Sequence, residues 1–141
     1  MCIRDRDTPG AVELVGKRIA PRLPAHIRLG MELHYDYEVD ESNAGAVAEA
    51  LLDSGIHLAL ITPGAHRHFA YGGIASLDGE ERRAARGFCE RTVDLAYGPL
   101  RKAWNPEPGL APSLALWTGS YGSDLATGGV AELYRQPHEG V

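Results

Sequence analysis

The sequence lacks the features that tie a chain to a membrane or to an oxidising compartment. No apolar run approaches the roughly 18 residues of a membrane-spanning helix, and the N-terminus has no secretory apolar core. Cysteine occurs only as Cys2 and Cys89, with no metal-binding or redox spacing between them. We therefore expect two free thiols in a cytoplasmic protein.

The sequence also lacks a large excess of positive or negative charge. The formal net charge is −5, and no block of like charges interrupts the chain. A basic surface of the kind that binds nucleic acid is therefore not expected, and neither is a membrane partner. With 44% hydrophobic residues, the 141 residues suffice for a packed domain and are not typical of a disordered chain.

The two ends of the chain match no helix or strand pattern. Segment 1–6 (MCIRDR) resembles a translated adapter remnant, so we expect the folded domain to comprise residues 7–141. His138 to Val141 carries no terminal element either, which favours a truncated gene.

What is present is a regular alternation of helices and strands. Thr8 followed by Pro9 is typical of a helix start, and a first helix is expected over 11–19. Further helices are expected over 44–54, 80–97 and 130–135, and strands over 27–34, 56–61 and 113–117. This order predicts βαβ units and a parallel sheet. The strands are continuous apolar runs, which predicts that both faces of the sheet are covered.

The pattern also limits the choice of α/β fold. No G-x-G-x-x-G motif follows the first strand and no Walker A motif occurs, which disfavours a nucleotide-binding sheet. A complete eight-stranded barrel takes about 250 residues. With three clear strands, the chain is predicted to be a fragment of a (β/α)8 TIM barrel with parallel strands, or else a smaller open sheet.

Polar residues gather where each strand ends, which is where α/β folds place their chemistry. Strand alternation puts Glu32, His34 and Asp36 on one face if the first strand continues that far. A carboxylate beside a histidine suits proton transfer. The alternative is a histidine that closes the strand with a hydrogen bond to loop backbone.

Two other segments are candidates for binding. His66 and His68 form a pair in the loop over 62–79, but zinc sites need three or four protein ligands, so a loop that covers a substrate is favoured. Trp117 at a strand end offers an apolar wall for the C–H face of a sugar, or packs under a turn. For Arg82 and Arg83 there are two alternatives. They bind a phosphate group, or they form an exposed first helical turn in which they pair with acidic neighbours.

Three residues are assigned to packing or to the surface. Cys89 is expected to pack in the core or to fill a helix position, His57 is expected in the core, and His26 is expected on the surface.

Together these motifs resemble the xylose isomerase family and the wider class of xylose-isomerase-like TIM barrels. The likeness covers roughly residues 10 to 135 and is strongest, without a gap, from Ile61 to Leu95. It is carried by these residues: Leu33-His34-Tyr35-Asp36, His66, Phe69, Gly72-Gly73, Asp78, Arg82-Arg83-Ala84-Ala85, Asp94-Leu95 and Trp117-Thr118-Gly119-Ser120-Tyr121-Gly122.

The resemblance implies a metal-dependent enzyme that interconverts aldoses and ketoses. His34 would sit at the ring oxygen of the sugar and assist ring opening. The family's orienting aspartate corresponds to Tyr37 here, so Asp36 or Asp40 is expected to replace it. Trp117 matches the family's pocket wall.

The resemblance has further implications for ligands and assembly. His66 and Phe69 would contact a small-molecule sugar together with that wall. Mg²⁺ or Mn²⁺ is expected in the full-length protein, bound by later strands that this chain lacks, so no residue of this chain is expected to be a metal ligand. The full-length protein is expected to be a homo-oligomer.

Three alternatives remain open. The first is a sugar epimerase on the same scaffold, with a carboxylate base in place of a hydride shift. The second is an endonuclease acting at abasic DNA sites, which the net charge and Trp117 disfavour. The third is an inactive fragment, because a half barrel leaves open sheet edges that invite pairing or aggregation.

Overall fold

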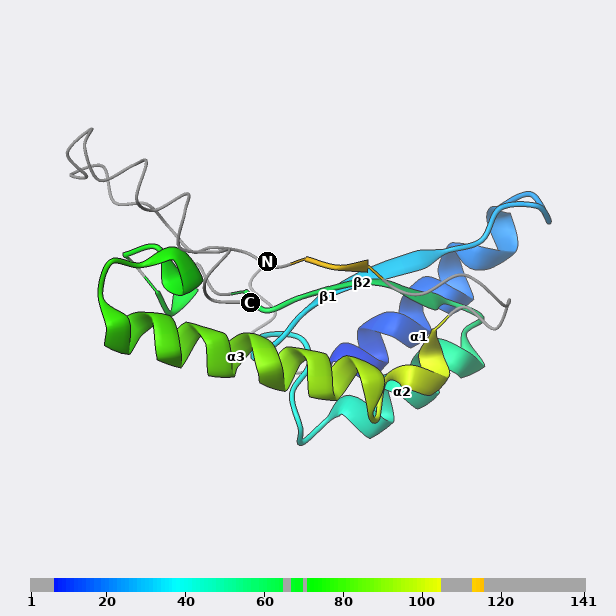
Figure 1. Ribbon diagram of the computed structural model, residues 1–141. Coiled ribbons are helices and arrows are strands. Elements are labelled where there is room, and N and C mark those ends of the chain that lie inside the picture. The colour runs from blue at the N-terminus through cyan, green and yellow to red at the C-terminus, as the bar shows by residue number, and fades with distance from the viewer. Residues whose placement is uncertain (1–6, 65–66, 70, 105–112, 116–141) are drawn as a thin grey trace. The chain divides into compact units, whose positions relative to one another are not determined.

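The computed structural model describes residues 7–64, 67–69, 71–104 and 113–115 (Figure 1). The chain forms two compact units. Unit 1 comprises Met1–Thr62 and Val93–Ala115, and unit 2 comprises Pro63–Thr92 and Leu116–Val141. The boundary between them falls inside the helix α3 (Gly79–Tyr97).

Unit 1 is a mixed α/β unit. Its helices are α1 (Thr8–Arg18), α2 (Ala44–Asp53) and the end of α3, with the short 3-10 turns η1 (Ala20–Arg22) and η4 (Arg101–Ala103). Its strands are β1 (Gly30–His34), β2 (His57–Thr62) and β3 (Ser113–Leu114). The expected helices and strands are therefore present, except those over 116–117 and 130–135, which lie outside the described residues.

The three strands form one parallel sheet in the order β1-β2-β3. This confirms the parallel sheet expected from the alternation of elements. β1 begins at Gly30, three residues later than predicted. Ile27, counted as part of the strand because it is apolar, is 47% exposed. The hydrophobic run is therefore longer than the strand.

An irregularity in β2 shifts the register of the sheet. Met31 pairs with Leu58, whereas the next residue, Glu32, pairs with Leu60. Ala59 is thus an extra residue in β2, as in a β-bulge. Bulges change which face of a sheet the following side chains occupy.

The bulge accounts for one expectation that is wrong. Leu58 and Ile61 are three residues apart, yet both are buried, and Ile61 pairs with the buried Leu33. On the other face, Glu32 and Ala59 are exposed. The prediction that both faces are covered is therefore wrong for the described strands, because an uninterrupted apolar run here reflects a bulged strand with one buried face.

The helices begin and end where capping chemistry dictates. The cap of α1 is Asp7 rather than Thr8, since the Asp7 carboxylate accepts a hydrogen bond from Gly10 N at 2.9 Å. Pro9 occupies the first turn, as predicted. α2 ends before Gly55, whose φ of 63° is a left-handed conformation that favours glycine.

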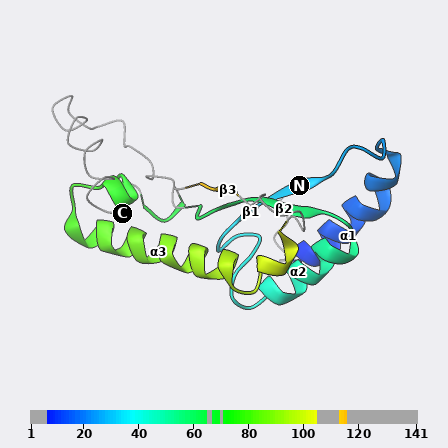
Figure 2. The ribbon, with the colours of Figure 1, turned by 45° about the vertical axis from the view of Figure 1, so that its right-hand side comes forward.

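α1 and α2 lie side by side on one face of the sheet (Figures 1 and 2). A Cβ at Gly16 of α1 would lie 2.5 Å from Ser54 Cβ, so only glycine permits this close approach. The core of unit 1 is almost entirely aliphatic. Its fully buried large side chains are those of Val12, Leu33, Val39, Val47, Leu51, Leu58, Ile61 and Leu100.

Unit 2 contains the 3-10 turn η3 (Gly73–Ala75) and the larger part of α3. Ile74, Ala85 and Cys89 form its buried cluster, and Phe69 packs against them. The prediction that Cys89 packs in the core is confirmed. No helix in the described parts of either unit is both long enough and apolar enough to cross a membrane.

The contrast between two adjacent leucines in α2 tests this packing. Leu51 is fully buried, whereas Leu52 is 49% exposed. Leu51→Ala should lower the free energy of unfolding by about 2–5 kcal/mol, because it removes apolar contacts and leaves a cavity. Leu52→Ala should change it by less than about 1 kcal/mol. Urea unfolding followed by circular dichroism measures both, and equal losses would contradict the described core.

Candidate functional site

The candidate site lies at the carboxyl ends of β1 and β2. His34, the last residue of β1, pairs in register with Thr62, the last residue of β2. Tyr35 N donates to Thr62 O at 2.8 Å, so the two strand ends are joined just beyond His34. The His34 side chain is 36% exposed. The imidazole is therefore accessible to a ligand while its backbone is held in the sheet.

Glu38 holds the imidazole in place. One carboxylate oxygen, Glu38 Oε2, lies 2.9 Å from His34 Nδ1 and accepts a hydrogen bond from His34 N at 2.6 Å. Because a carboxylate accepts and does not donate, this contact favours the tautomer with hydrogen on Nδ1. Nε2 then carries a lone pair that can accept a proton. The pair therefore has the arrangement of a histidine oriented by a carboxylate, which suits proton transfer.

A tight turn brings Glu38 back to His34. His34 O accepts hydrogen bonds from Glu38 N at 3.0 Å and from Val39 N at 3.3 Å. Within the turn Asp36 has a φ of 62°, a left-handed conformation that aspartate tolerates better than most residues. Asp36 N donates to Val39 O at 2.9 Å. The chain therefore reverses immediately after β1.

The pairing expected of Asp36 is thus made by Glu38. β1 ends at His34, so the alternation that would align Asp36 with Glu32 and His34 does not extend to it. Asp40, the other expected partner, is buried and instead accepts hydrogen bonds from the backbone and hydroxyl of Ser42. Glu38 makes this contact because the turn after β1 brings the fourth residue beyond His34 back to its ring.

Further hydrogen bonds fix the backbone of Glu38. Its carbonyl accepts from Thr8 Oγ1 at 2.6 Å and from Asn43 Nδ2 at 3.0 Å. Tyr35 OH donates to Glu41 at 2.7 Å on the same segment. The backbone of the residue that orients His34 is therefore held by residues of α1 and of the start of α2.

A second carboxylate faces the other ring nitrogen. Glu32 Oε1 lies 3.8 Å from His34 Nε2, and the Glu32 side chain is 52% exposed. The distance is longer than a hydrogen bond, and an ion pair forms only when the imidazole is protonated. His34 therefore lies between two carboxylates at the carboxyl end of β1.

These residues do not form a metal site. Within the ranges that the structure describes, no three His, Cys, Asp or Glu side chains are arranged to hold a metal ion. The Mg²⁺ or Mn²⁺ that the family resemblance implies needs several oxygen ligands, and the described residues do not supply such a set.

The loop of unit 2 contains the other predicted binding residues that the structure describes. Phe69 is half-buried, and its ring centroid lies 5.8 Å from that of Phe88 in an edge-to-face arrangement. His68 is exposed and its ring lies 4.8 Å from Phe88. Phe69 therefore serves packing in this unit. His66 and Trp117 lie outside the described residues.

Glu81 of α3 anchors this loop. Its carboxylate accepts hydrogen bonds from Tyr71 N at 3.0 Å, Gly73 N at 3.2 Å and Ser76 Oγ at 3.3 Å. Gly72, with a φ of 105°, gives the loop a conformation that glycine alone adopts readily. The segment over 71–76 is therefore tied to the helix that follows it.

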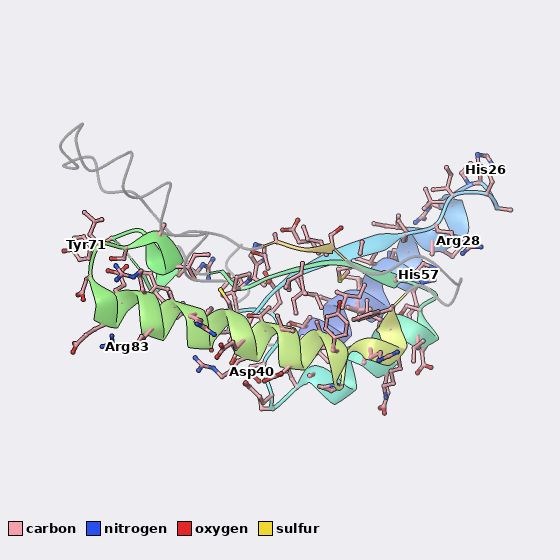
Figure 3. The ribbon with its side chains drawn as sticks, viewed as in Figure 1. His26, Arg28, Asp40, His57, Tyr71 and Arg83 are labelled. Carbon is pink, nitrogen blue, oxygen red and sulfur yellow. The ribbon has the colours of Figure 1, made fainter. Side chains whose placement is uncertain are left out.

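The other basic and histidine residues named from the sequence have surface positions. Arg83 pairs with Glu80 at 4.0 Å on an exposed helical turn, as predicted. His26 is exposed, as predicted, and His57, expected in the core, is only half-buried. Both histidines lie near the amino end of the sheet, opposite to His34 (Figure 3).

Comparison with known proteins found no relative. No family model, no curated protein and no solved structure matches this chain. Its function is therefore inferred from the geometry of the site and from the motifs of the sequence.

The tautomer of His34 tests the role assigned to Glu38. Glu38→Gln should reduce the fraction of imidazole with hydrogen on Nδ1, because a neutral amide accepts more weakly than a carboxylate. The ring ¹⁵N shifts report this fraction by NMR. Asp36→Asn removes a carboxylate from the same turn and should leave these shifts unchanged. A larger effect of Asp36→Asn than of Glu38→Gln would show that Asp36, and not Glu38, orients His34.

Alkylation of Cys89 tests the packing of unit 2. Burial, and secondarily the charge of Glu90, raises the pKa of the Cys89 thiol. Iodoacetamide at pH 7 should modify Cys89 at least about tenfold more slowly in the folded chain than in urea, because the thiolate is the nucleophile. Peptide mass spectrometry follows Cys89 separately from Cys2, and equal rates would contradict its burial.

The raised pKa of the Cys89 thiol also predicts a pH dependence of stability. Since this pKa is raised on folding, the free energy of unfolding should fall as pH increases through the folded value.

Proposed function

We propose that this chain supplies the sugar-ring-opening part of a metal-dependent aldose–ketose isomerase of the xylose-isomerase-like class. The observation that carries the proposal is the Glu38–His34 pair at the carboxyl end of a parallel strand. Ring opening of an aldose requires a base at the anomeric hydroxyl, and an oriented neutral imidazole is such a base.

The arrangement of the sheet supports a partial (β/α)8 barrel as the scaffold. The strands are parallel and adjacent in chain order, and α1 and α2 cover one face (Figure 1). In a βα barrel the helices form the outer layer and the inner face carries the active site at the strand carboxyl ends. Leu33 lies on the buried face of β1. By strand alternation, Glu32 and His34 belong to the opposite face.

The proton transfers of the proposed step can be written in full. His34 Nε2 takes the proton from the anomeric hydroxyl as C1=O forms and the bond from C1 to the ring oxygen breaks. The ring oxygen receives a proton from solvent or from the imidazolium, which yields the open-chain aldehyde. Glu38 stabilises the imidazolium through Nδ1–H at 2.9 Å. The step consumes no co-reactant.

Ring opening is separable from the isomerisation that follows it. In the proposed class, a bound divalent metal ion would supply polarisation of the open-chain sugar. The described residues offer no group of ligands for such an ion. Ring opening, by contrast, needs only the general base, so it can be measured on the chain itself.

Mutarotation provides that measurement. The chain should accelerate the interconversion of α- and β-glucose, followed by polarimetry in weakly buffered solution, because each interconversion passes through ring opening. His34→Ala should remove about 10²-fold or more of this acceleration, the range of a single general base. Glu38→Gln should cost at least about tenfold, since the base loses its orientation.

A matched histidine serves as the control. His26 is exposed and lies beyond the amino end of β1, so His26→Ala should retain the wild-type rate. The proposal fails if the folded wild-type chain gives no acceleration, or if His34→Ala accelerates mutarotation as well as His26→Ala does.

A further inference from the structure

The nitrogen that would meet a substrate is flanked by a carboxylate with no part in the step proposed above. Glu32 Oε1 lies 3.8 Å from His34 Nε2, on the open face of strand β1. Its side chain is 52% exposed and can approach a ligand bound at Nε2. Any group that binds this nitrogen therefore lies within a few ångströms of a negative charge.

The surrounding chain is rich in carboxylates. Residues 29–66 contain no lysine or arginine. The segment 32–41, which ends β1 and forms the turn, contains five carboxylates: Glu32, Asp36, Glu38, Asp40 and Glu41. Like charges at short range disfavour a bound anion, and a partly dehydrated site screens them less than water does.

Basic side chains of unit 1 are engaged with other groups. Lys17 pairs with Glu13 at 2.8 Å, and Lys102 pairs with Glu49 at 3.2 Å. Arg101 lies over the Trp104 ring, 5.9 Å from its centroid. Arg28 lies before β1, at the end of the strand opposite to His34 (Figure 3).

Two further arginines lie on the first helix and its extension. Arg22 donates to the carbonyl of Arg18, and both are exposed. The ring of His34, by contrast, is bound to Glu38 at 2.9 Å and has Glu32 3.8 Å from its other nitrogen.

We propose that Glu32 is a specificity-determining residue, which restricts the His34 site to uncharged sugars by repelling anionic ones such as uronates and sugar phosphates. The substrate class rests on the proposed function, but the repulsion of anions does not. Glu38 cannot take this role, because its carboxylate is bound to Nδ1 on the other side of the ring.

Phosphate binding tests the repulsion directly. Inorganic phosphate is titrated into the labelled chain while NMR follows the His34 ring. Glu32→Gln should tighten the phosphate dissociation constant about three- to tenfold at low salt, and the gain should shrink toward 1 M salt, where the Debye length is about 3 Å. Glu49→Gln, which removes the same charge from the exposed face of α2, should have no such effect. Equal changes in the two variants would overturn the proposal.

Sugar selectivity tests the consequence for substrates. The ratio of mutarotation rates for glucose 6-phosphate and glucose, each corrected for the uncatalysed rate, should rise about three- to tenfold in Glu32→Gln and stay constant in Glu49→Gln. An unchanged ratio in Glu32→Gln would refute its role in selectivity. If neither sugar is accelerated, the proposed function fails, and the phosphate titration alone still decides whether Glu32 repels anions. Thermal unfolding confirms that both variants are folded.

Discussion

The site depends on the hydrogen bonds of one residue, Glu38. Its carboxylate binds the backbone and ring of His34, and its carbonyl accepts from Thr8 in α1 and from Asn43 at the start of α2. One residue thus joins the end of β1 to the helices α1 and α2. Hydrogen bonds to a charged carboxylate are stronger than those between neutral groups, so this junction can hold an exposed imidazole in a single orientation.

The secondary structure can be read from the sequence where local chemistry defines it. The helix expected over 44–54 ends one residue earlier in the structure, because Gly55 adopts a left-handed conformation that stops it. The start of β1 cannot be placed in the same way, since an apolar residue such as Ile27 does not reveal its exposure. The bulge at Ala59 is also hidden in the sequence, because the apolar side chains around it conceal the break in alternation.

Of the two residues that form the site, only His34 can be predicted from the sequence. His34 can be identified because a polar residue that ends an apolar strand is conspicuous. Glu38 escapes the same reasoning because its contact depends on a turn in which Asp36 takes a positive φ, and strand alternation cannot foresee a reversal. A carboxylate four residues after the histidine, with turn-forming Asp36 between them, is the signal that could have found it.

The contact of Thr8 with Glu38 has a consequence for how the protein can be shortened. Thr8 lies in the first turn of α1, 30 residues before the carbonyl that it binds. Proteolysis or an alternative translation start that removed this turn would delete a donor to Glu38 while leaving every residue of the sheet in place. The first helical turn is therefore a remote part of the scaffold that orients the imidazole, and removing it should loosen the residue that holds the His34 ring.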